Sequence, residues 1–273
     1  MFIIYNEAIE KAMREDPYIP TIDALTLTAT ADNSSVKLTK IGTVDNTYEV
    51  NMGSGWVPYT FDTVINLNKG QSCKWRCTSH PTSFNNFDTY VQFVMTGSIE
   101  ASGEVYSMLS SNLSDVTTLN GYNYAFVNLF LGCSSLTRAP ELPATTLAPH
   151  CYHRMFGFCS SLTSAPELPA TTLAPGCYAQ ILMGCESLTQ APSLPATTLA
   201  EGCYESMFHT CSNLKEVRIA ATKTAKDALY AWLSFVPATG DFYCDPSATI
   251  FPTDSNSGIP ANWVRRNIAD YPN

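Results

Sequence analysis

The sequence is poor in charged side chains, in histidine and in long apolar runs. Charged residues make up 14% of the 273 residues, the net charge is −9, and lysine and arginine nowhere cluster. We therefore expect no nucleic-acid binding, because phosphate recognition needs a basic patch. No apolar run approaches the roughly 18 residues of a membrane span, so we expect no membrane insertion either.

The motifs of common catalytic sites are also missing. The chain has no G-x-S-x-G, no glycine-rich phosphate loop and no H-E-x-x-H. We expect no catalytic residue, no cofactor and no metal. Cys73, Cys77 and His80 offer three zinc ligands or a disulfide, but ordinary roles are favoured because an extended strand separates the two cysteines by about 13 Å. Asp254–Gly258 begins like a calcium loop but lacks the final carboxylate, which favours a polar turn.

A secretory signal is not recognisable at the start of the chain. Signals have a basic start and an apolar run of about 7–15 residues, whereas here only four residues are apolar before the acidic ones begin. These four are Phe2, Ile3, Ile4 and Tyr5. We expect residues 1–20 to form an arm that either packs on the next domain or anchors the protein in a partner. The missing signal favours synthesis in the cytoplasm and assembly into something larger.

The sequence does contain a unit of 26 residues that occurs three times in succession. Unit 1 starts at Cys133, unit 2 at Cys159 and unit 3 at Cys185, and a fourth, unit 4, opens at Cys211. A fixed period of this length is typical of stacked supersecondary units that share one core. Residues 107–132 match the units in part and are expected to seal the start of the stack.

Each unit is expected to contain one strand and one helix. Leu136–Leu142 has an extended pattern that Pro143 ends. Leu147, Cys151 and Met155 then follow one another at intervals of four, which predicts a helix with one apolar stripe. One strand and one helix per unit is the plan of a leucine-rich-repeat solenoid.

The other regions complete a predicted α+β fold. Residues 21–106 alternate apolar and polar side chains between regular turns, which predicts an antiparallel, immunoglobulin-like β-sandwich. The solenoid is expected over residues 107–221. A C-terminal cap over residues 222–273 is expected to begin with a helix at Thr222–Phe235.

The cysteines follow the repeat. Seven of the ten occupy two fixed unit positions, so they are expected to stack within the core as reduced, buried thiols. The positions that differ between units form a second set, on the strand face that solenoids generally use for binding. This candidate binding face comprises Arg138, Glu141, Ser164, Glu167, Gln190, Ser193 and Glu216. Simple solvation of these side chains is the alternative.

A family resemblance adds to this interpretation. The sequence CSSLTSAPELPATTLAPGCY, in a frame C-x-x-L…L-P…C-Y-x-x-M-F, resembles the BspA-type leucine-rich repeats of gut Bacteroidales surface proteins. The resemblance covers about residues 24–265 and is strongest in the repeats. It implies an adhesin or interaction protein and not an enzyme. Family members are normally exported, while similar repeats also occur in phages of these bacteria.

Two locations follow from the resemblance. The missing signal favours a virion protein, a head or tail decoration or fibre with its repeats facing outward toward a host protein or glycan. Its arm would contact other assembly proteins, and a homo-oligomer is compatible with this role. A bacterial cell-surface adhesin is the first alternative. A carbohydrate-active enzyme is the second, and it requires paired carboxylates in one cleft.

Overall fold

A computed structural model describes residues 23–79, 86–110, 118–253 and 256–271. Its strands are β1 (Thr26–Ala29), β2 (Ser34–Ile41), β3 (Tyr48–Asn51), β4 (Trp56–Tyr59), β5 (Ile65–Leu67), β6 (Ser72–Cys77), β7 (Tyr90–Thr96), β8 (Ile99–Ser102), β9 (Leu136–Arg138), β10 (Glu216–Arg218), β11 (Thr239–Cys244) and β12 (Asn262–Asn267). Two 3₁₀ turns, η1 (Val105–Met108) and η2 (Ile268–Asp270), are the helical elements of these residues. In the described ranges there is no α-helix, and the fold is all-β.

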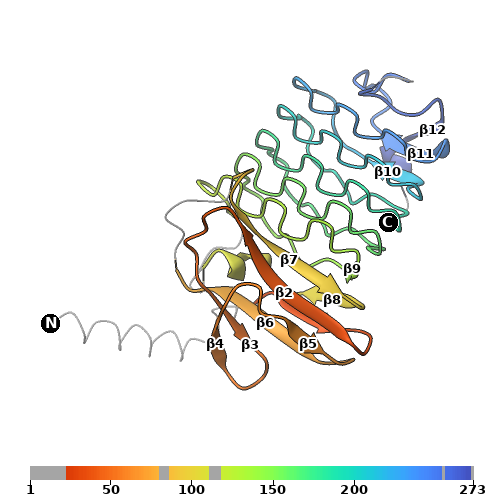
Figure 1. Cartoon of the computed structure of the whole chain (residues 1–273). Coiled ribbons are helices and arrows are strands. Elements are labelled where there is room, and N and C mark those ends of the chain that lie inside the picture. Colours follow the sequence, from red (N-terminus) through yellow and green to blue (C-terminus); the bar gives the residue numbers. More distant parts are fainter. Residues whose placement is uncertain (1–22, 80–85, 111–117, 254–255, 272–273) are drawn as a thin grey trace, which may run out of the picture.

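The strands before the repeats form two facing sheets (Figure 1). One has the order β4-β3-β6-β1-β8-β9 and the other the order β5-β2-β7, and the pairs among β1 to β8 are antiparallel. Every second side chain of β2 and β6 is buried, as the period-two pattern predicts. Trp75 of one sheet meets Phe93 of the other edge-on, with ring centroids 5.2 Å apart. The core of this region therefore lies between the two sheets.

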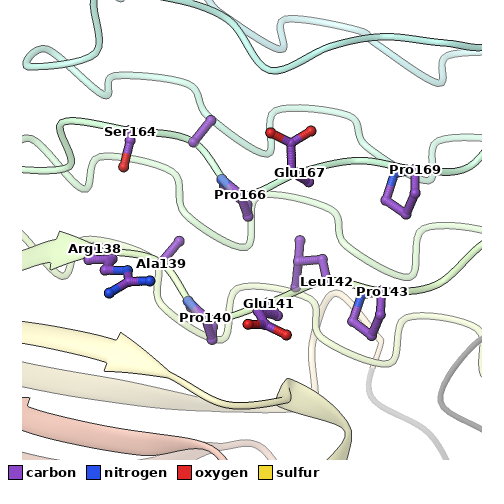
Figure 2. Close-up of a pocket in the computed structure, with 11 residues that line it drawn as sticks. Arg138, Ala139, Pro140, Glu141, Leu142, Pro143, Ser164, Pro166, Glu167 and Pro169 are labelled. Carbon is purple, nitrogen blue, oxygen red and sulfur yellow. The ribbon is translucent and has the colours of Figure 1, made fainter.

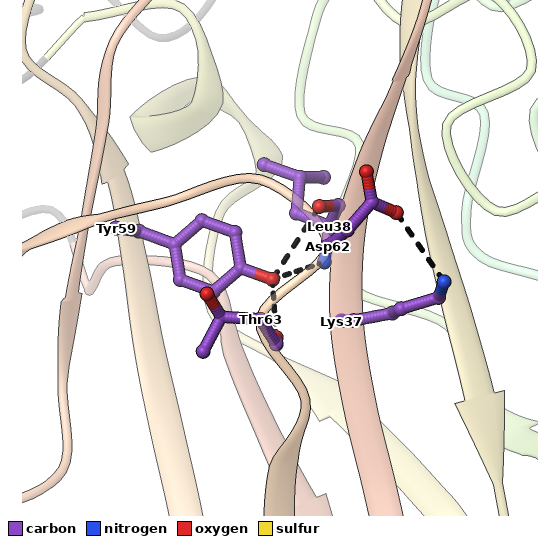
Figure 3. A network of polar contacts seen from close by, with 5 residues as sticks. All are labelled: Lys37, Leu38, Tyr59, Asp62 and Thr63. Atoms are coloured by element: carbon purple, nitrogen blue, oxygen red, sulfur yellow. Dashed lines mark hydrogen bonds and ion pairs between the residues drawn. The ribbon is translucent and has the colours of Figure 1, made fainter.

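The hydroxyl of Tyr59 ties the two sheets together (Figure 3). It accepts a hydrogen bond from the Leu38 backbone N–H at 3.0 Å and donates to the Thr63 carbonyl at 2.6 Å. The Tyr59 ring packs edge-on against Trp75 at 4.7 Å. Beside it, Lys37 pairs with Asp62 at 3.3 Å on the exposed surface. Since β4 and β2 belong to different sheets, the tyrosine fixes how one lies over the other.

The repeats continue from the first sheet without a break in the core. β9 of unit 1 pairs in parallel with β8 and so becomes its edge strand. Phe93 of β7 stacks on Phe130, with centroids 5.2 Å apart and planes inclined by 19°. Figure 1 shows the units stacked beyond β9, ending at β10–β12. One apolar cluster accordingly runs from the sheets through all the units.

The stretch predicted as a helix in each unit is a ribbon of consecutive turns. In residues 124–133, alternate N–H groups donate within the ribbon, as from Ala125 to the Tyr122 carbonyl at 3.3 Å. The N–H groups between them donate to the next unit, as from Phe126 to the Cys151 carbonyl at 2.8 Å. The same alternation recurs in units 1 to 3. Almost every N–H of the ribbon thus has a hydrogen-bond partner, as burial of a backbone demands.

The ribbon requires a left-handed residue at every fourth position. Over residues 124–235, the residues with φ between +50° and +72° are Tyr124, Asn128, Gly132, His150, Arg154, Phe158, Gly176, Gln180, Gly184, Gly202, Ser206, Thr210, Asp227, Ala231 and Phe235. An α-helix has no such residue. Most of these residues carry a Cβ, which costs about 1–2 kcal/mol each in this conformation. Inter-unit hydrogen bonds and burial must offset that cost.

The predicted α+β class and the strand-plus-helix solenoid are therefore wrong. A ribbon of turns with a period of four residues buries the same side chains as the predicted helix would. Cys151 and Met155 are buried in the ribbon, and the helix prediction also placed them in its apolar stripe. The predicted helix at Thr222–Phe235 is wrong for the same reason. Its residues 226–235 form turns that bury Trp232 completely. The period of the apolar pattern therefore did not distinguish a turn ribbon from an α-helix.

The 26-residue register itself is confirmed by the stacked side chains. Tyr152 lies on Tyr178 at 5.7 Å with planes inclined by 3°, and Tyr178 lies on Tyr204 at 6.2 Å. In a second column, the Cys159 thiol donates to the Phe130 carbonyl at 3.1 Å, and the Cys133, Cys185 and Cys211 thiols make equivalent bonds at 3.1–3.2 Å. All ten cysteines are free and buried.

The far end of the stack is a small parallel sheet, β10-β11-β12. The Trp232 indole donates to the Gly258 carbonyl at 2.9 Å, and Trp263 donates to the Pro237 carbonyl at 2.8 Å. Phe242 packs edge-on against Trp232 and Phe251. These residues cover the last unit, which would otherwise expose its apolar face.

Candidate functional site

The extended segments of units 1 to 3 lie side by side along one face of the stack. They are residues 138–143, 164–169 and 190–195, and each has proline at its third and sixth positions. Proline lacks an N–H and restricts the backbone, which weakens pairing with a neighbouring strand. Among the described residues, no backbone hydrogen bond joins the first segment to the second, or the second to the third.

Unit 4 shows what happens without these prolines. Arg218 and Ala221 replace them, and the segment becomes strand β10. Ala191 N–H then donates to the Glu216 carbonyl at 2.9 Å, and Leu194 N–H donates to the Arg218 carbonyl at 3.2 Å. The prolines of units 1 to 3 therefore coincide with an open stretch of the stack, in which backbone groups have no partner from the neighbouring segment.

Hollows occupy this open stretch. The hollow between units 1 and 2 has a volume of about 470 Å³, and Figure 2 shows its two rows of lining residues. The hollow between units 2 and 3, of about 410 Å³, shares Ser164, Ala165 and Glu167 with it. A third, of about 490 Å³, shares Glu141 and reaches the first sheet at Glu104. We call these three adjoining hollows the groove.

The groove brings together the residues predicted as a binding face. Arg138, Glu141, Ser164, Glu167, Gln190 and Ser193 all line it. In Figure 2, Arg138 and Glu141 lie on either side of Pro140, which is buried and forms part of the floor. The charged side chains are exposed and project from a floor of proline and alanine. The groove is therefore polar at its rim and apolar at its base.

Glu216, the seventh predicted residue, lies outside the three hollows and is engaged within the protein. Its carboxylate accepts a hydrogen bond from the Tyr271 hydroxyl at 2.6 Å. Arg218 lies over the Tyr271 ring, 4.7 Å from its centroid, and Tyr271 itself packs against Tyr243 at 4.8 Å. The last described residue of the chain thus closes one end of the groove, and the repeat pattern carried no signal of that.

The opposite end of the groove contains charges that sequence reasoning missed. Asp23, Lys74 and Glu104 come from the first sheet or just outside its strands and line the hollow that includes Glu141. Glu104 pairs with Glu141 across a parallel bridge, and one Glu104 carboxylate oxygen is buried without a hydrogen-bond partner. Burial, followed by the charges of Glu141 and Asp23, raises the pKa of Glu104. These residues lie outside the repeats, so no periodicity points to them.

The other residues that the sequence brought into question are not at the groove. Cys73 and Cys77 are buried in β6, where the Trp75 indole donates to the Cys73 sulfur at 3.2 Å. His80, Asp254 and the proposed anchor Phe2, Ile3, Ile4 and Tyr5 lie outside the described residues. Within those residues, no three histidine, cysteine, aspartate or glutamate side chains are placed to hold a metal ion.

Comparison with known proteins gives no relative. No protein-family model matches the chain, no curated protein is similar to it, and no solved structure matches its fold. In the described part of the chain, no helical segment has the length and apolar character needed to cross a bilayer. The case for a function therefore depends on the groove itself.

Proposed function

We propose that this is a non-enzymatic binding and display protein that holds its ligand in the groove of units 1 to 3. One observation carries this proposal: two of the positions that differ between the repeated units line the groove and supply the charged side chains that the units contribute to it, while the other differences lie mainly in the turn ribbon. Arg138, Ser164 and Gln190 share one unit position, and Glu141, Glu167 and Ser193 share another. Packing restricts which residues can stand at the core positions, so these differ little between units. The exposed positions are not restricted in this way and can change to suit a ligand.

The proposed setting is a surface where such a face is presented outward. The resemblance of the units to BspA-type repeats supports adhesion in gut Bacteroidales or in their phages, where the protein would decorate a head or tail and contact a host protein or glycan. A bacterial cell-surface adhesin is the alternative setting. Mass spectrometry of purified particles tests the choice, because a virion component must be present in them at a fixed ratio to the major capsid protein.

Binding to cells tests the groove. We would label the protein with a fluorophore and measure its retention on intact Bacteroidales cells by flow cytometry. The variant Arg138→Ala/Glu141→Gln/Glu167→Gln should lose most of the binding. Glu186→Gln is the matched control, since Glu186 is an exposed glutamate of unit 3 outside the groove. Equal binding by the triple variant and the control would reject the groove as the adhesive surface.

The same samples address the enzyme alternative. Glu141 and Glu167 line one hollow, which is the pairing that glycoside hydrolysis requires. Both are exposed on an open surface, however, whereas a carboxylic acid that donates a proton at neutral pH generally needs burial. Release of reducing sugar from host polysaccharide by the wild type, lost in Glu141→Gln, would replace the binding proposal with hydrolysis.

A further inference from the structure

We infer that residues 86–89 form a clasp on the start of the stack, which is closed near neutral pH and opens in acid when His150 and His153 bind protons. The inference is independent of the groove and of the proposed binding function. It concerns the turn ribbon, where Phe87 of the clasp lies against both histidines. Opening would change the surface that the protein presents without unfolding it.

The clasp is a turn that is held together by its own hydrogen bonds. The Asn86 side-chain oxygen accepts hydrogen bonds from the backbone N–H groups of Asp88 and Thr89, at 2.8 and 2.9 Å, and from the Thr89 hydroxyl at 2.8 Å. The neighbouring strand β7 is joined to the ribbon separately, since the Phe93 N–H donates to the Leu129 carbonyl at 2.8 Å. The turn can therefore move away from the ribbon while its own bonds and those of β7 remain.

Phe87 brings the clasp into contact with the ribbon. Its ring meets the rings of Tyr124, His150 and His153 edge-on, with centroids 5.0, 5.3 and 4.9 Å away. His150 in turn stacks on Tyr124 at 5.0 Å, with planes inclined by 10°. The Phe87 ring is still 48% exposed, so this contact lies at the surface and can break without opening the core.

The two histidines are placed so that binding a proton is costly while the clasp is closed. The Nδ1 atom of each is buried without a hydrogen-bond partner. A neutral imidazole can leave one ring nitrogen without a proton, whereas a charged one has N–H donors at both positions. A charged ring would therefore bury a positive N–H group that has no acceptor. Movement of the Phe87 ring away from the histidines would let water solvate that group.

Negative charges do not compensate for these protons. In the part of the chain that the structure describes, His150, His153 and Arg154 form no ion pair, with Asp88 of the clasp or with any other residue. The Nε atom of Arg154 is also buried without a partner. The two histidine rings lie 5.9 Å apart, so their positive charges would repel each other. Burial lowers the pKa of both histidines, and the charges of His150 and Arg154 lower the pKa of His153 further.

Ring contacts measured by NMR in the full-length protein test this inference. We would label phenylalanine, tyrosine and histidine with ¹³C and follow the nuclear Overhauser effect between the rings of Phe87 and Tyr124, which we call the clasp contact. It should be present at about pH 7 and lost at about pH 4, as the histidine resonances report proton binding. The same effect between Phe93 and Phe130, the core contact, should persist at both pH values.

A variant without the two histidines tests whether they trigger the opening. His150→Phe/His153→Phe should keep the clasp contact at about pH 4, because phenylalanine cannot bind a proton. The substitution suits the backbone at position 150, since Phe158 already has the same left-handed conformation in unit 1, with φ +60° against +55° for His150. The clasp contact can be measured in this variant, because Phe87 and Tyr124 are both unchanged.

His209→Phe is the matched control. His209 is a histidine of unit 3 that packs edge-on against Phe235 at 5.1 Å, so its variant should lose the clasp contact in acid as the wild type does. A clasp contact that persists in the wild type at about pH 4 would overturn the inference. Its loss in His150→Phe/His153→Phe would do the same, because the histidines would then not be the trigger. Loss of the core contact together with the clasp contact would show general unfolding in acid instead of a local opening.

Discussion

The ring of Phe93 stacks on the ring of Phe130, with centroids 5.2 Å apart, and this contact joins the strands of the first domain to the turns of the repeats. Both rings are completely buried, and Phe130 is stacked in turn on Phe156 at 5.5 Å. Phe93 also meets Trp75 between the two sheets. The column of stacked phenylalanine rings that reaches Phe156 of unit 1 therefore begins inside the strand region, and the two parts share one core.

This shared core predicts one cooperative unfolding transition. Phe93→Ala and Phe130→Ala should each lower the free energy of unfolding by about 3–5 kcal/mol. The double variant should show a coupling of about 0.5–1.5 kcal/mol, as stacked aromatic pairs do. Urea unfolding followed by circular dichroism and tryptophan fluorescence measures all three. Phe242→Ala, at the far end of the stack, is the control and should be additive with Phe93→Ala; two separate transitions would contradict the prediction.

A glycine of the turn ribbon provides a test that distinguishes turns from helix. Gly184 has φ +72°, and a Cβ added to it would lie 2.5 Å from Cδ1 of Phe158. Gly184→Ala should therefore destabilise the protein by about 2–4 kcal/mol, from backbone strain and the clash together. In an α-helix the same substitution would stabilise by about 1 kcal/mol. The sign of the change in thermal or urea unfolding decides between the two structures.

Gly132→Ala is the matched control for this experiment. Gly132 occupies the same unit position with φ +71°, but a Cβ there meets nothing within 4 Å. Gly132→Ala should lower the free energy of unfolding only by the cost of backbone strain, about 1–2 kcal/mol. Adding Phe158→Ala to Gly184→Ala should recover the difference between the two glycines. A larger cost at Gly132 than at Gly184 would show that the placement of Phe158 is wrong.

The same residues explain how far the sequence could predict the structure. The alternating patterns of residues 21–106 correspond to strands, and the 26-residue shift matches the stacking of Tyr152 on Tyr178. The prediction of helices was wrong because burial of every fourth residue suits a turn ribbon as well as a helix. Two glycines, at positions 176 and 184, were the available signal, since glycine recurring at intervals of eight within one apolar stretch is unfavourable in a helix.

The groove was predictable only in part. Variation between units identified Arg138, Glu141, Ser164 and Glu167, because residues at one unit position must line one face of a stack. Glu104 and Lys74 were not accessible to this reasoning, since they reach the groove through strand pairing between distant parts of the chain. The prolines leave the segments of units 1 to 3 unpaired with one another, and this effect was recognised only by comparison with unit 4. There other residues replace the prolines and the segment forms strand β10.

The buried cysteines are predicted to be reduced but unreactive. Burial raises the pKa of Cys133, Cys159, Cys177 and Cys185 above the ordinary value, and that of Cys73 to about 12. Since the thiolate is the reactive form, the native protein should react with a thiol reagent at pH 8 only as fast as it unfolds. In denaturant without reductant, all ten cysteines should react at once.

An engineered surface thiol controls for reagent access. Ser134 is exposed, so Ser134→Cys should add one thiol that reacts immediately in the native protein. Fewer than ten reactive thiols in the denatured wild type would show that some are paired as disulfides. Rapid reaction of several thiols in the native wild type would show that the column is open to solvent, against the burial described for it.

A pair of histidines predicts how stability changes with pH. His150 and His153 pack against Phe87, with ring centroids 5.3 and 4.9 Å away, and the Nδ1 atom of each is buried without a partner. Burial, followed by the charges of His150 and Arg154, lowers the pKa of His153 to about 4, and burial lowers that of His150. The unfolded chain binds a proton at each histidine below about pH 6.5, whereas in the folded protein His153 stays neutral until about pH 4 and the pKa of His150 also lies below its ordinary value.

The contribution of His153 to the free energy of unfolding should therefore be complete above pH 6.5 and be lost as the pH falls from 6.5 to about 4. His153 alone should account for a loss of about 3 kcal/mol in the free energy of unfolding over this range. Urea unfolding at several pH values should be measured for the wild type and for His153→Phe. The difference between their curves of unfolding free energy against pH isolates the contribution of His153. Phe87→Ala should weaken the dependence by letting water reach the rings, while Val57→Ala, an exposed valine of β4, should not. Parallel curves for the wild type and His153→Phe would show that His153 takes up its proton equally in both states.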